Sequence, residues 1–261
     1  MKTDLQGKHA LVCGGSEGIG RAAAIALAAR GATITLLARR ADRLDAVRAT
    51  LPTPLQQTHG TLSADVSDRD SLRAKIGALC AALSVDILVN NTAGPPGGPA
   101  HAAAPEQYLQ VFQQHLLANQ TLLQSVLPGM QAARWGRIVN VISTSVKEPI
   151  ANLGVSNTIR GAVASWAKTL ATELAPFGIT VNNVLPGYTQ TQRLQQILAE
   201  RAAASGKPAA EIAQGMLATV PAGRFAEPEE IAAAIVFLCS PEAGYVNGIN
   251  LPVDGGRTKS L

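Results

Sequence analysis

The sequence has few aromatic residues, no long apolar run and no leader-like N-terminus. Aromatic residues make up only 3% of the 261 residues, so close contacts in the core must rest mostly on small aliphatic side chains. No window contains about 18 consecutive apolar residues, which excludes an ordinary transmembrane helix. The first residues are polar and lack the apolar stretch of a signal peptide. We therefore expect a cytoplasmic protein without a membrane partner.

The signals for metal binding and nucleic-acid binding are also missing. The three cysteines are far apart and form no CxxC pair, so we expect them to be reduced thiols. The four histidines show no metal-ligand spacing. The net charge is +4, but the basic residues are scattered, whereas a nucleic-acid site needs a clustered basic surface. We expect no metal and no nucleic acid.

Short apolar, β-branched segments alternate with longer helical patterns along the whole chain. Continuous apolar strands are typical of a sheet buried on both faces, and the strand–helix–strand order implies parallel strands with right-handed crossovers. We predict a single α/β domain over residues 1–261. The predicted strands are 9–13, 33–38, 58–65, 86–90, 137–142, 180–184 and 249–253, and the predicted helices lie near 19–30, 41–50, 68–83, 105–133, 152–176 and 228–239.

The stretch 188–223 does not follow this alternation. It is polar, rich in alanine and glutamine, and poorly periodic. Long irregular segments inside a compact domain are often functional, and active-site lids are a common case. We therefore predict that 188–223 is a lid over a small-molecule substrate.

A glycine-rich turn follows the first predicted strand. Residues 10–20 read ALVCGGSEGIG and lead into an alanine-rich helix. Glycine permits a tight turn and the close approach of a pyrophosphate, while the helix N-terminus offers free N–H groups. Because strand, turn and helix occur in this order, the pattern predicts a dinucleotide site. Its predicted contacts are Gly14, Ser16, Gly18, Ile19 and Gly20.

The end of the second predicted strand bears on which dinucleotide is bound. An NAD site usually places an acid about 20 residues past the turn, on the ribose 2′-hydroxyl. Here the strand ends in LARR at 37–40, and Arg39 can pair with a 2′-phosphate. Glu17, inside the turn, argues the other way because its charge would repel that phosphate. We expect NADP(H), with NAD(H) as the alternative.

These motifs together resemble the short-chain dehydrogenase/reductase family, in particular its 3-oxoacyl-ACP-reductase-like members. The resemblance runs through CGGSEGIG at 13–20, ADV at 64–66, LVNN at 88–91, AKTLATELAPFGITVNNVLPG at 167–187 and VDGG near the C-terminus. It implies a Rossmann-type doubly wound fold, a seven-stranded parallel sheet in the order 3-2-1-4-5-6-7, and a homotetramer or homodimer. It also implies cofactor contacts from Asp65 and Val66 at the adenine, Asn90 and Asn91 in the groove, and Pro186, Gly187, Thr189 and Thr191 at the nicotinamide end.

The catalytic residues of that family are largely replaced in this sequence. The family uses a serine, a tyrosine 13 residues later, a lysine four residues after the tyrosine, and an asparagine on an earlier helix. Ser143 matches the serine, but Ser156, Arg160 and His115 occupy the other three positions. No YxxxK sequence occurs anywhere in the chain. The resemblance thus implies a degenerate catalytic set, with Arg160 also placed to hold the nicotinamide ribose.

The replacements change the proton chemistry that we expect. A tyrosine with a pKa near ~10 can be brought into range by a neighbouring cation, whereas the hydroxyl of Ser156 is a far weaker acid. Arg160 keeps its proton but can stabilise a developing oxyanion. His115 titrates near neutral pH in its ordinary range, so we expect His115 or a water to move the proton; a packing role on a helix face is the alternative. Ser143 is expected to anchor the substrate oxygen.

Three functions fit a retained glycine turn beside an altered catalytic set. We favour an NADP(H)-dependent oxidoreductase acting on a carbonyl or alcohol, because the rest of the cofactor groove is kept. The second is a nucleotide-binding sensor or partner protein without redox turnover. The third is a non-redox enzyme on the same fold, such as a cyclase, dehydratase or isomerase.

Overall fold

The computed structural model describes residues 3–260 and contains one parallel seven-stranded sheet. The strands lie in the order β3-β2-β1-β4-β5-β6-β7, which confirms the predicted order and the Rossmann-type fold. Their bounds are β1 (His9–Cys13), β2 (Thr33–Ala38), β3 (Gly60–Ser63), β4 (Ile87–Asn90), β5 (Gly136–Val141), β6 (Ile179–Pro186) and β7 (Asn250–Val253).

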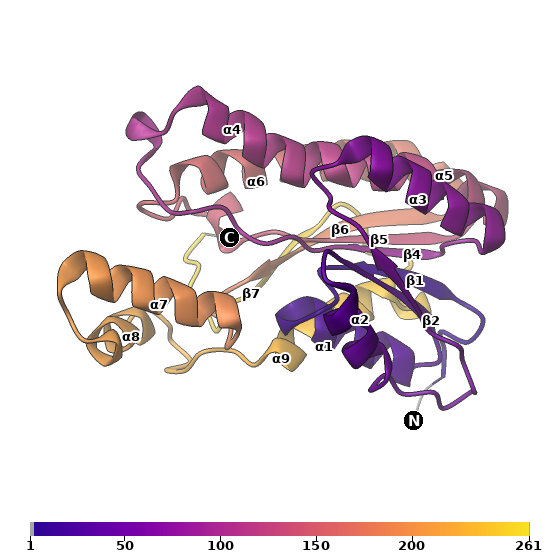
Figure 1. Cartoon of the computed structure of the whole chain (residues 1–261), viewed down its shortest axis with the longest axis horizontal. Helices are drawn as coiled ribbons and strands as arrows, with labels where there is room; N and C mark the ends of the chain where they lie inside the picture. Colours follow the sequence, from indigo (N-terminus) through magenta and orange to yellow (C-terminus); the bar gives the residue numbers. More distant parts are fainter. Residues whose placement is uncertain (1–2, 261) are drawn as a thin grey trace.

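Helices cover both faces of the sheet (Figure 1). One face carries α1 (Gly18–Ala29), α2 (Ala41–Arg48) and α9 (Pro228–Cys239), and the other carries α3 (Arg69–Ala82), α4 (Pro105–Phe112), α5 (Ala118–Ala133) and α6 (Gly154–Leu174). Within residues 3–260, no helix is long and apolar enough to cross a membrane.

Each face of the sheet has its own apolar core. Along β1, Val12 belongs to the cluster that includes α1 and α9, while Leu11 belongs to the cluster that includes α3 and α5. Val89 and Leu88 on β4 divide in the same way. Successive strand side chains point to opposite faces, so a strand covered on both sides is mostly apolar along its length, as the sequence pattern predicts.

The predicted helix over 105–133 is interrupted. A π-helical turn, Gln113–Leu117, separates α4 from α5. Such turns are rare and occur mostly at functional sites. His115 lies at the middle of this turn, and the interruption therefore marks one of the predicted catalytic positions.

The stretch 188–223 contains two helices that the sequence pattern does not predict. These are α7 (Gln192–Ser205) and α8 (Ala209–Leu217), which lie to one side of the sheet in Figure 1. Leu194, Leu198 and Met216 form a small cluster between them. Because the two helices bury their apolar residues against each other rather than in the main core, the segment is mostly polar.

Candidate active site

The glycine turn lies at the carboxyl end of β1 and has no room for a side chain at Gly14 or Gly20. Gly14 and Gly18 have φ values of 61° and 54°, in the left-handed region that favours glycine. A Cβ on Gly20 would lie 2.2 Å from the carbonyl oxygen of Gly14, and one on Gly14 would lie 2.6 Å from the carbonyl oxygen of Asn91. The turn is therefore a bare backbone cradle before a helix N-terminus, which fits a pyrophosphate.

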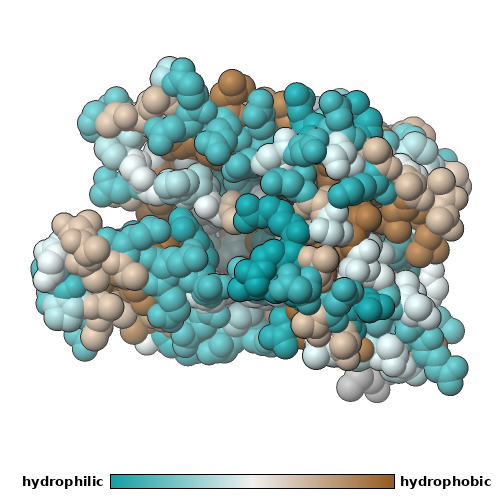
Figure 2. Space-filling model, in the orientation of Figure 1, coloured by the Kyte–Doolittle hydropathy of each residue, from teal (hydrophilic) through white to brown (hydrophobic). Residues whose placement is uncertain are grey.

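A cleft of about 820 Å³ extends from this turn across the carboxyl ends of the strands. Figure 2 shows a hollow near the centre of one face, bordered by hydrophilic side chains. Most of the residues predicted from the motifs line the cleft: Gly14, Ser16, Gly18, Ile19, Arg39, Asp65, Val66, Asn91, Arg160, Pro186, Gly187, Thr189 and Thr191. The cleft is thus built from segments spread over most of the chain.

Two residues expected at the groove lie beneath its surface. Gly20 is buried against Gly14. Asn90 is 3% exposed, and its Nδ2 donates to Oδ1 of Asn140 at 2.8 Å. Asn140 in turn donates to Asn183, and Asn183 to Asn250. Asn90 therefore begins a chain of amides across the sheet, while Asn91 is the asparagine that faces the cleft.

The charges at the far end of the cleft bear on the choice of cofactor, for which Arg39 favours a 2′-phosphate and Glu17 disfavours it. Nη1 of Arg43 donates to Oε2 of Glu17 at 2.9 Å, so the carboxylate has a cationic partner. Arg40 pairs with Asp42 at 3.5 Å. Arg39 makes no ion pair with any residue of the described chain. This end of the cleft therefore offers an unpaired cation, and the repulsion expected from Glu17 is offset by Arg43.

Arg160 is a buried cation at the other end of the cleft. It lies in α6, its side chain is largely enclosed, and Nη1 donates to the carbonyl oxygen of Val141 at 3.0 Å. Burial, together with the positive charge of Arg193, lowers the pKa of Arg160 to about 10. Arg160 therefore remains charged at neutral pH and places a fixed positive charge at the cleft.

His115 is held by a residue that the motifs do not identify. Its Nδ1 lies 2.6 Å from Oγ1 of Thr92, which lines the cleft. Nε2 has no hydrogen-bond partner within the described residues. Burial, and then the charge of Arg160, lower the pKa of His115 to about 3, although the Ala93 backbone acts in the opposite direction. The expectation that this ring titrates near neutral pH is therefore wrong: the imidazole is neutral, with one unpaired nitrogen.

Ser143 and Ser156 do not line the cleft, although Ile142 and Arg160, which are near them in sequence, do. Ser143 follows β5, and its hydroxyl accepts the N–H of Ser145 at 3.1 Å. Ser156 is 8% exposed in the first turn of α6. The structure therefore brings Arg160 and Thr92 to the cleft surface, with His115 beneath Thr92, and keeps both serine hydroxyls back from that surface.

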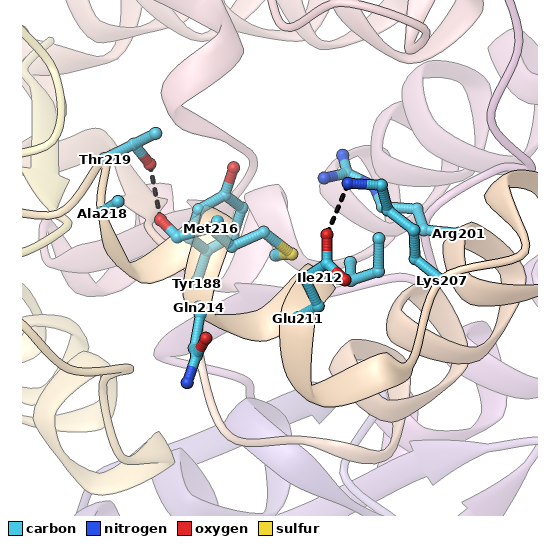
Figure 3. A pocket seen from close by; sticks show the side chains of 10 residues that line it. Tyr188, Arg201, Lys207, Glu211, Ile212, Gln214, Met216, Ala218 and Thr219 are labelled. Carbon is cyan, nitrogen blue, oxygen red and sulfur yellow. Dashed lines mark hydrogen bonds and ion pairs between the residues drawn. The ribbon is translucent and has the colours of Figure 1, made fainter.

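A second pocket lies at the lid, between α7 and α8 (Figure 3). Tyr188 and Met216 form one end, and an ion pair between Lys207 and Glu211 crosses the other. Tyr188 also lines the main cleft, so the two spaces share a wall. None of the predicted cofactor or catalytic residues lines this second pocket within the described chain.

Comparisons with known proteins agree with this geometry. A family model described as enoyl-(acyl carrier protein) reductase matches residues 14–258. The 3-oxoacyl-[acyl-carrier-protein] reductase of Vibrio harveyi is 35% identical over 258 residues, covering 97% of this chain and 98% of the relative. The NADPH-dependent reductase BacG of Bacillus subtilis is 30% identical, covering 97% and 99%.

The solved structures give the same result. L-sorbose reductase from Gluconobacter frateurii, in complex with NADPH and L-sorbose, superimposes with a TM-score of 0.92 and 32% identity, and 100% of each chain is covered. The match spans the glycine turn, the sheet and the lid alike. The chain therefore belongs to the short-chain dehydrogenase/reductase family, whose members are NAD(P)-dependent oxidoreductases.

Proposed function

We propose that this protein is an NADP(H)-dependent oxidoreductase that interconverts a carbonyl compound and an alcohol. The observation that carries this proposal is one continuous cleft with a bare glycine cradle, Arg39 unpaired at one end and Arg160 at the other. The relatives support the choice of cofactor, because BacG is named as NADPH-dependent and the sorbose reductase was solved with NADPH.

The cleft residues divide by the part of the cofactor that they would hold. The glycine turn takes the pyrophosphate on backbone N–H groups, and Arg39 pairs with the 2′-phosphate. Asp65 and Val66 contact the adenine, and Pro186, Gly187, Thr189 and Thr191 hold the nicotinamide end. When bound there, the cofactor supplies or accepts a hydride.

In this proposal the protein's own catalytic groups are the charged Arg160 and a proton relay through neutral His115. Arg160 stabilises the negative charge that develops on the substrate oxygen, and it does so without moving a proton. Ser143 anchors the same oxygen once its hydroxyl turns from Ser145 toward the cleft. A neutral imidazole has one N–H and one acceptor nitrogen. In the direction of reduction, Thr92 gives its proton to the substrate oxygen and takes one from Nδ1 of His115, while Nε2 of His115 accepts a proton from a water. Ser156 takes no proton-transfer role, because its hydroxyl, unlike that of Thr92, neither lines the cleft nor contacts His115.

The segment 188–223 serves as the lid over this site. Residues at its start, namely Tyr188, Thr189 and 191–194, line the cleft, while α7 and α8 are held by their own small cluster. A unit that packs on itself can move relative to the sheet without disrupting the main core.

The test is NADPH oxidation with a panel of ketones and aldehydes. We expect turnover in the wild type and a loss of about 100-fold in kcat in Ser143→Ala, with no loss in Ser165→Ala, an exposed serine further along α6. Tight NADPH binding without turnover of any carbonyl would instead favour a sensor or partner protein. Product formation without a change in nicotinamide absorbance would favour a cyclase, dehydratase or isomerase.

A further inference from the structure

Two arginines from different elements flank Gly94, just after the carboxyl end of β4. A Cβ placed on Gly94 would lie 3.8 Å from Nη2 of Arg160 and 3.9 Å from Nε of Arg193. Arg160 comes from α6 and Arg193 from the first turn of α7. Both line the cleft, as does Gly94 itself. The two guanidinium groups therefore border one side-chain-free space.

The donors that face this space have no protein partner. Arg160 uses Nη1 for Val141, and Arg193 uses Nη2 for the carbonyl oxygen of Pro95 at 2.9 Å. Over residues 3–260, Arg160 makes no ion pair, and the carboxylate of Glu200 is 3.8 Å from Nη1 of Arg193, beyond hydrogen-bond length. Nη2 of Arg160 and Nε of Arg193 are thus left for a ligand.

Within residues 3–260 this arrangement is only partly neutralised, because Glu200 forms an ion pair with Nη1 of Arg193 at 3.8 Å while Arg160 has none. Arg160 is 8% exposed, so water screens its charge poorly, and Arg193 is among the causes of its lowered pKa. Two like charges in a partly desolvated cleft repel each other. An anion bound over Gly94 would reverse that cost and would accept a hydrogen bond from each arginine. The N-terminus of α7, which carries Arg193, adds positive potential.

The cofactor phosphates are placed elsewhere. The glycine turn follows β1, whereas Arg160 is bonded to the end of β5, two strands away in the order β1-β4-β5. Adjacent strands are about 4.8 Å apart, so the bond between Arg160 and β5 lies roughly 10 Å from the pyrophosphate cradle, and the space over Gly94, which follows β4, lies between the two. Arg39 lies still further off, after β2 on the other side of β1. The space over Gly94 therefore faces the substrate side of the cleft.

We propose that Arg160 and Arg193 together bind the carboxylate of the substrate, so that the substrate is an oxo acid with its carboxylate next to the reacting carbonyl. The inference rests on the proposed function for the reaction and adds the substrate class. A carboxylate has the charge and the two acceptor oxygens that a pair of guanidinium donors recognises. Arg193 is then a specificity-determining residue, and Arg160 serves the carboxylate and the carbonyl oxygen in place of the contact with the nicotinamide ribose that the family resemblance implies for this position.

The test compares short 2-oxo acids with their methyl esters in the wild type, Arg193→Gln and Arg193→Lys. We expect the wild type to prefer the acid, and Arg193→Gln to lower kcat/KM for the acid by about 10- to 100-fold, the value of one charge-assisted hydrogen bond. Activity on the ester should change less than about threefold, and Arg193→Lys should recover part of the loss. Arg201→Gln, two turns further along α7 and on the second pocket, is the matched control and should behave as the wild type.

NADPH affinity and the acid-to-ester activity ratio together show whether Arg193 binds the substrate or the cofactor. NADPH affinity, measured by fluorescence titration, should be unchanged in Arg193→Gln; a tenfold loss of NADPH affinity with an unchanged acid-to-ester ratio would show that Arg193 binds a cofactor phosphate and would overturn the proposal. An unchanged ratio with unchanged NADPH affinity would overturn it as well.

Binding of oxamate, an unreactive analogue of a 2-oxo acid, keeps the test independent of turnover. If the wild type reduces no carbonyl at all, the proposed function fails, and calorimetric titration of the NADPH-loaded protein with oxamate decides the anion site. Binding that weakens about tenfold or more in Arg193→Gln supports the site, whereas no binding, or equal binding by both proteins, contradicts it.

Discussion

The hydroxyl oxygen of Thr92 lies 2.6 Å from Nδ1 of His115. This contact joins the loop after β4 to the π-helical turn between α4 and α5. Thr92 faces the cleft while His115 is 4% exposed, so the pair connects a buried ring to the place where a substrate would lie.

His115 should make the stability of the protein depend on pH. Its pKa is about 3 in the folded chain and 6.5 when unfolded, so the unfolded state binds the proton first. The contribution of neutral His115 to the free energy of unfolding is complete above pH 6.5 and is lost as the pH falls from 6.5 toward 3. Between pH 7.5 and pH 5, the free energy of unfolding should fall by about 2 kcal/mol more in the wild type than in His115→Asn. Urea denaturation at both pH values measures this; an equal fall in the two proteins would show that His115 is protonated when folded.

Arg39 should decide between the two nicotinamide cofactors. Replacing Arg39 by Gln removes the one cation of this rim without an ion pair among the described residues. We expect kcat/KM for NADPH to fall by about 10- to 100-fold, while kcat/KM for NADH stays within about threefold. Arg48→Gln, on the exposed side of α2, is the control. Equal losses with both cofactors would place Arg39 away from the 2′-phosphate.

The glycine cradle should not tolerate one methyl group at Gly20. A Cβ there would lie 2.2 Å from the carbonyl oxygen of Gly14, so Gly20→Ala should cost about 1–3 kcal/mol of stability and abolish NADPH binding. Gly77→Ala is the matched control, because Gly77 lies in α3 and a methyl group added there would meet no atom within 4 Å; alanine at that position should add about 0.5–1 kcal/mol. Fluorescence titration and thermal unfolding test both variants, and full NADPH affinity in Gly20→Ala would refute the role of the cradle.

Restoring the family's proton donor should raise ketone reduction. In Ser156→Tyr with Arg160→Lys, a tyrosine hydroxyl whose pKa is lowered by a nearby ammonium can protonate the substrate oxygen. General acid–base catalysis by a well-placed group raises a rate by about 100-fold or more. We therefore expect kcat on neutral ketones to rise by about tenfold or more. Ser156→Phe with Arg160→Lys supplies the same bulk without the hydroxyl and should show no gain. An absence of gain in the tyrosine variant would mean that the site is shaped for different chemistry.

The parallel strands were predictable because they depend on local patterns, whereas the order of the seven strands came from the resemblance to the family. The fully apolar run that leads into the end of β4 and the strand–helix alternation around it determine a buried parallel strand without knowledge of its neighbours. The lid helices were missed, although Leu194 and Leu198 share the helical i, i+4 spacing, as do Ile212 and Met216. The surrounding polar residues hid this signal, because the two helices need apolar residues only where they face each other.

The candidate site was predictable where its chemistry is contiguous in sequence, as in the glycine turn. The partners that complete it come from distant segments. Glu17 and Arg43 are 26 residues apart, and Arg193 and Pro95 are 98 apart, so no spacing pattern identifies either contact. The low pKa of His115 depends on burial by tertiary structure and on the charge of Arg160, neither of which a linear sequence displays.

Hydride transfer from the cofactor to a carbonyl carbon distinguishes an oxidoreductase from the alternative functions, and an isotope experiment measures it. The protein is incubated with a 2-oxo acid and NADPH deuterated at both C4 positions, and the product is analysed by mass spectrometry. We expect a hydroxy acid that carries one deuterium on the former carbonyl carbon, formed at least about 100-fold more slowly by Ser143→Ala. A product without deuterium, or no reduction of any carbonyl tested although NADPH binds tightly, would contradict it.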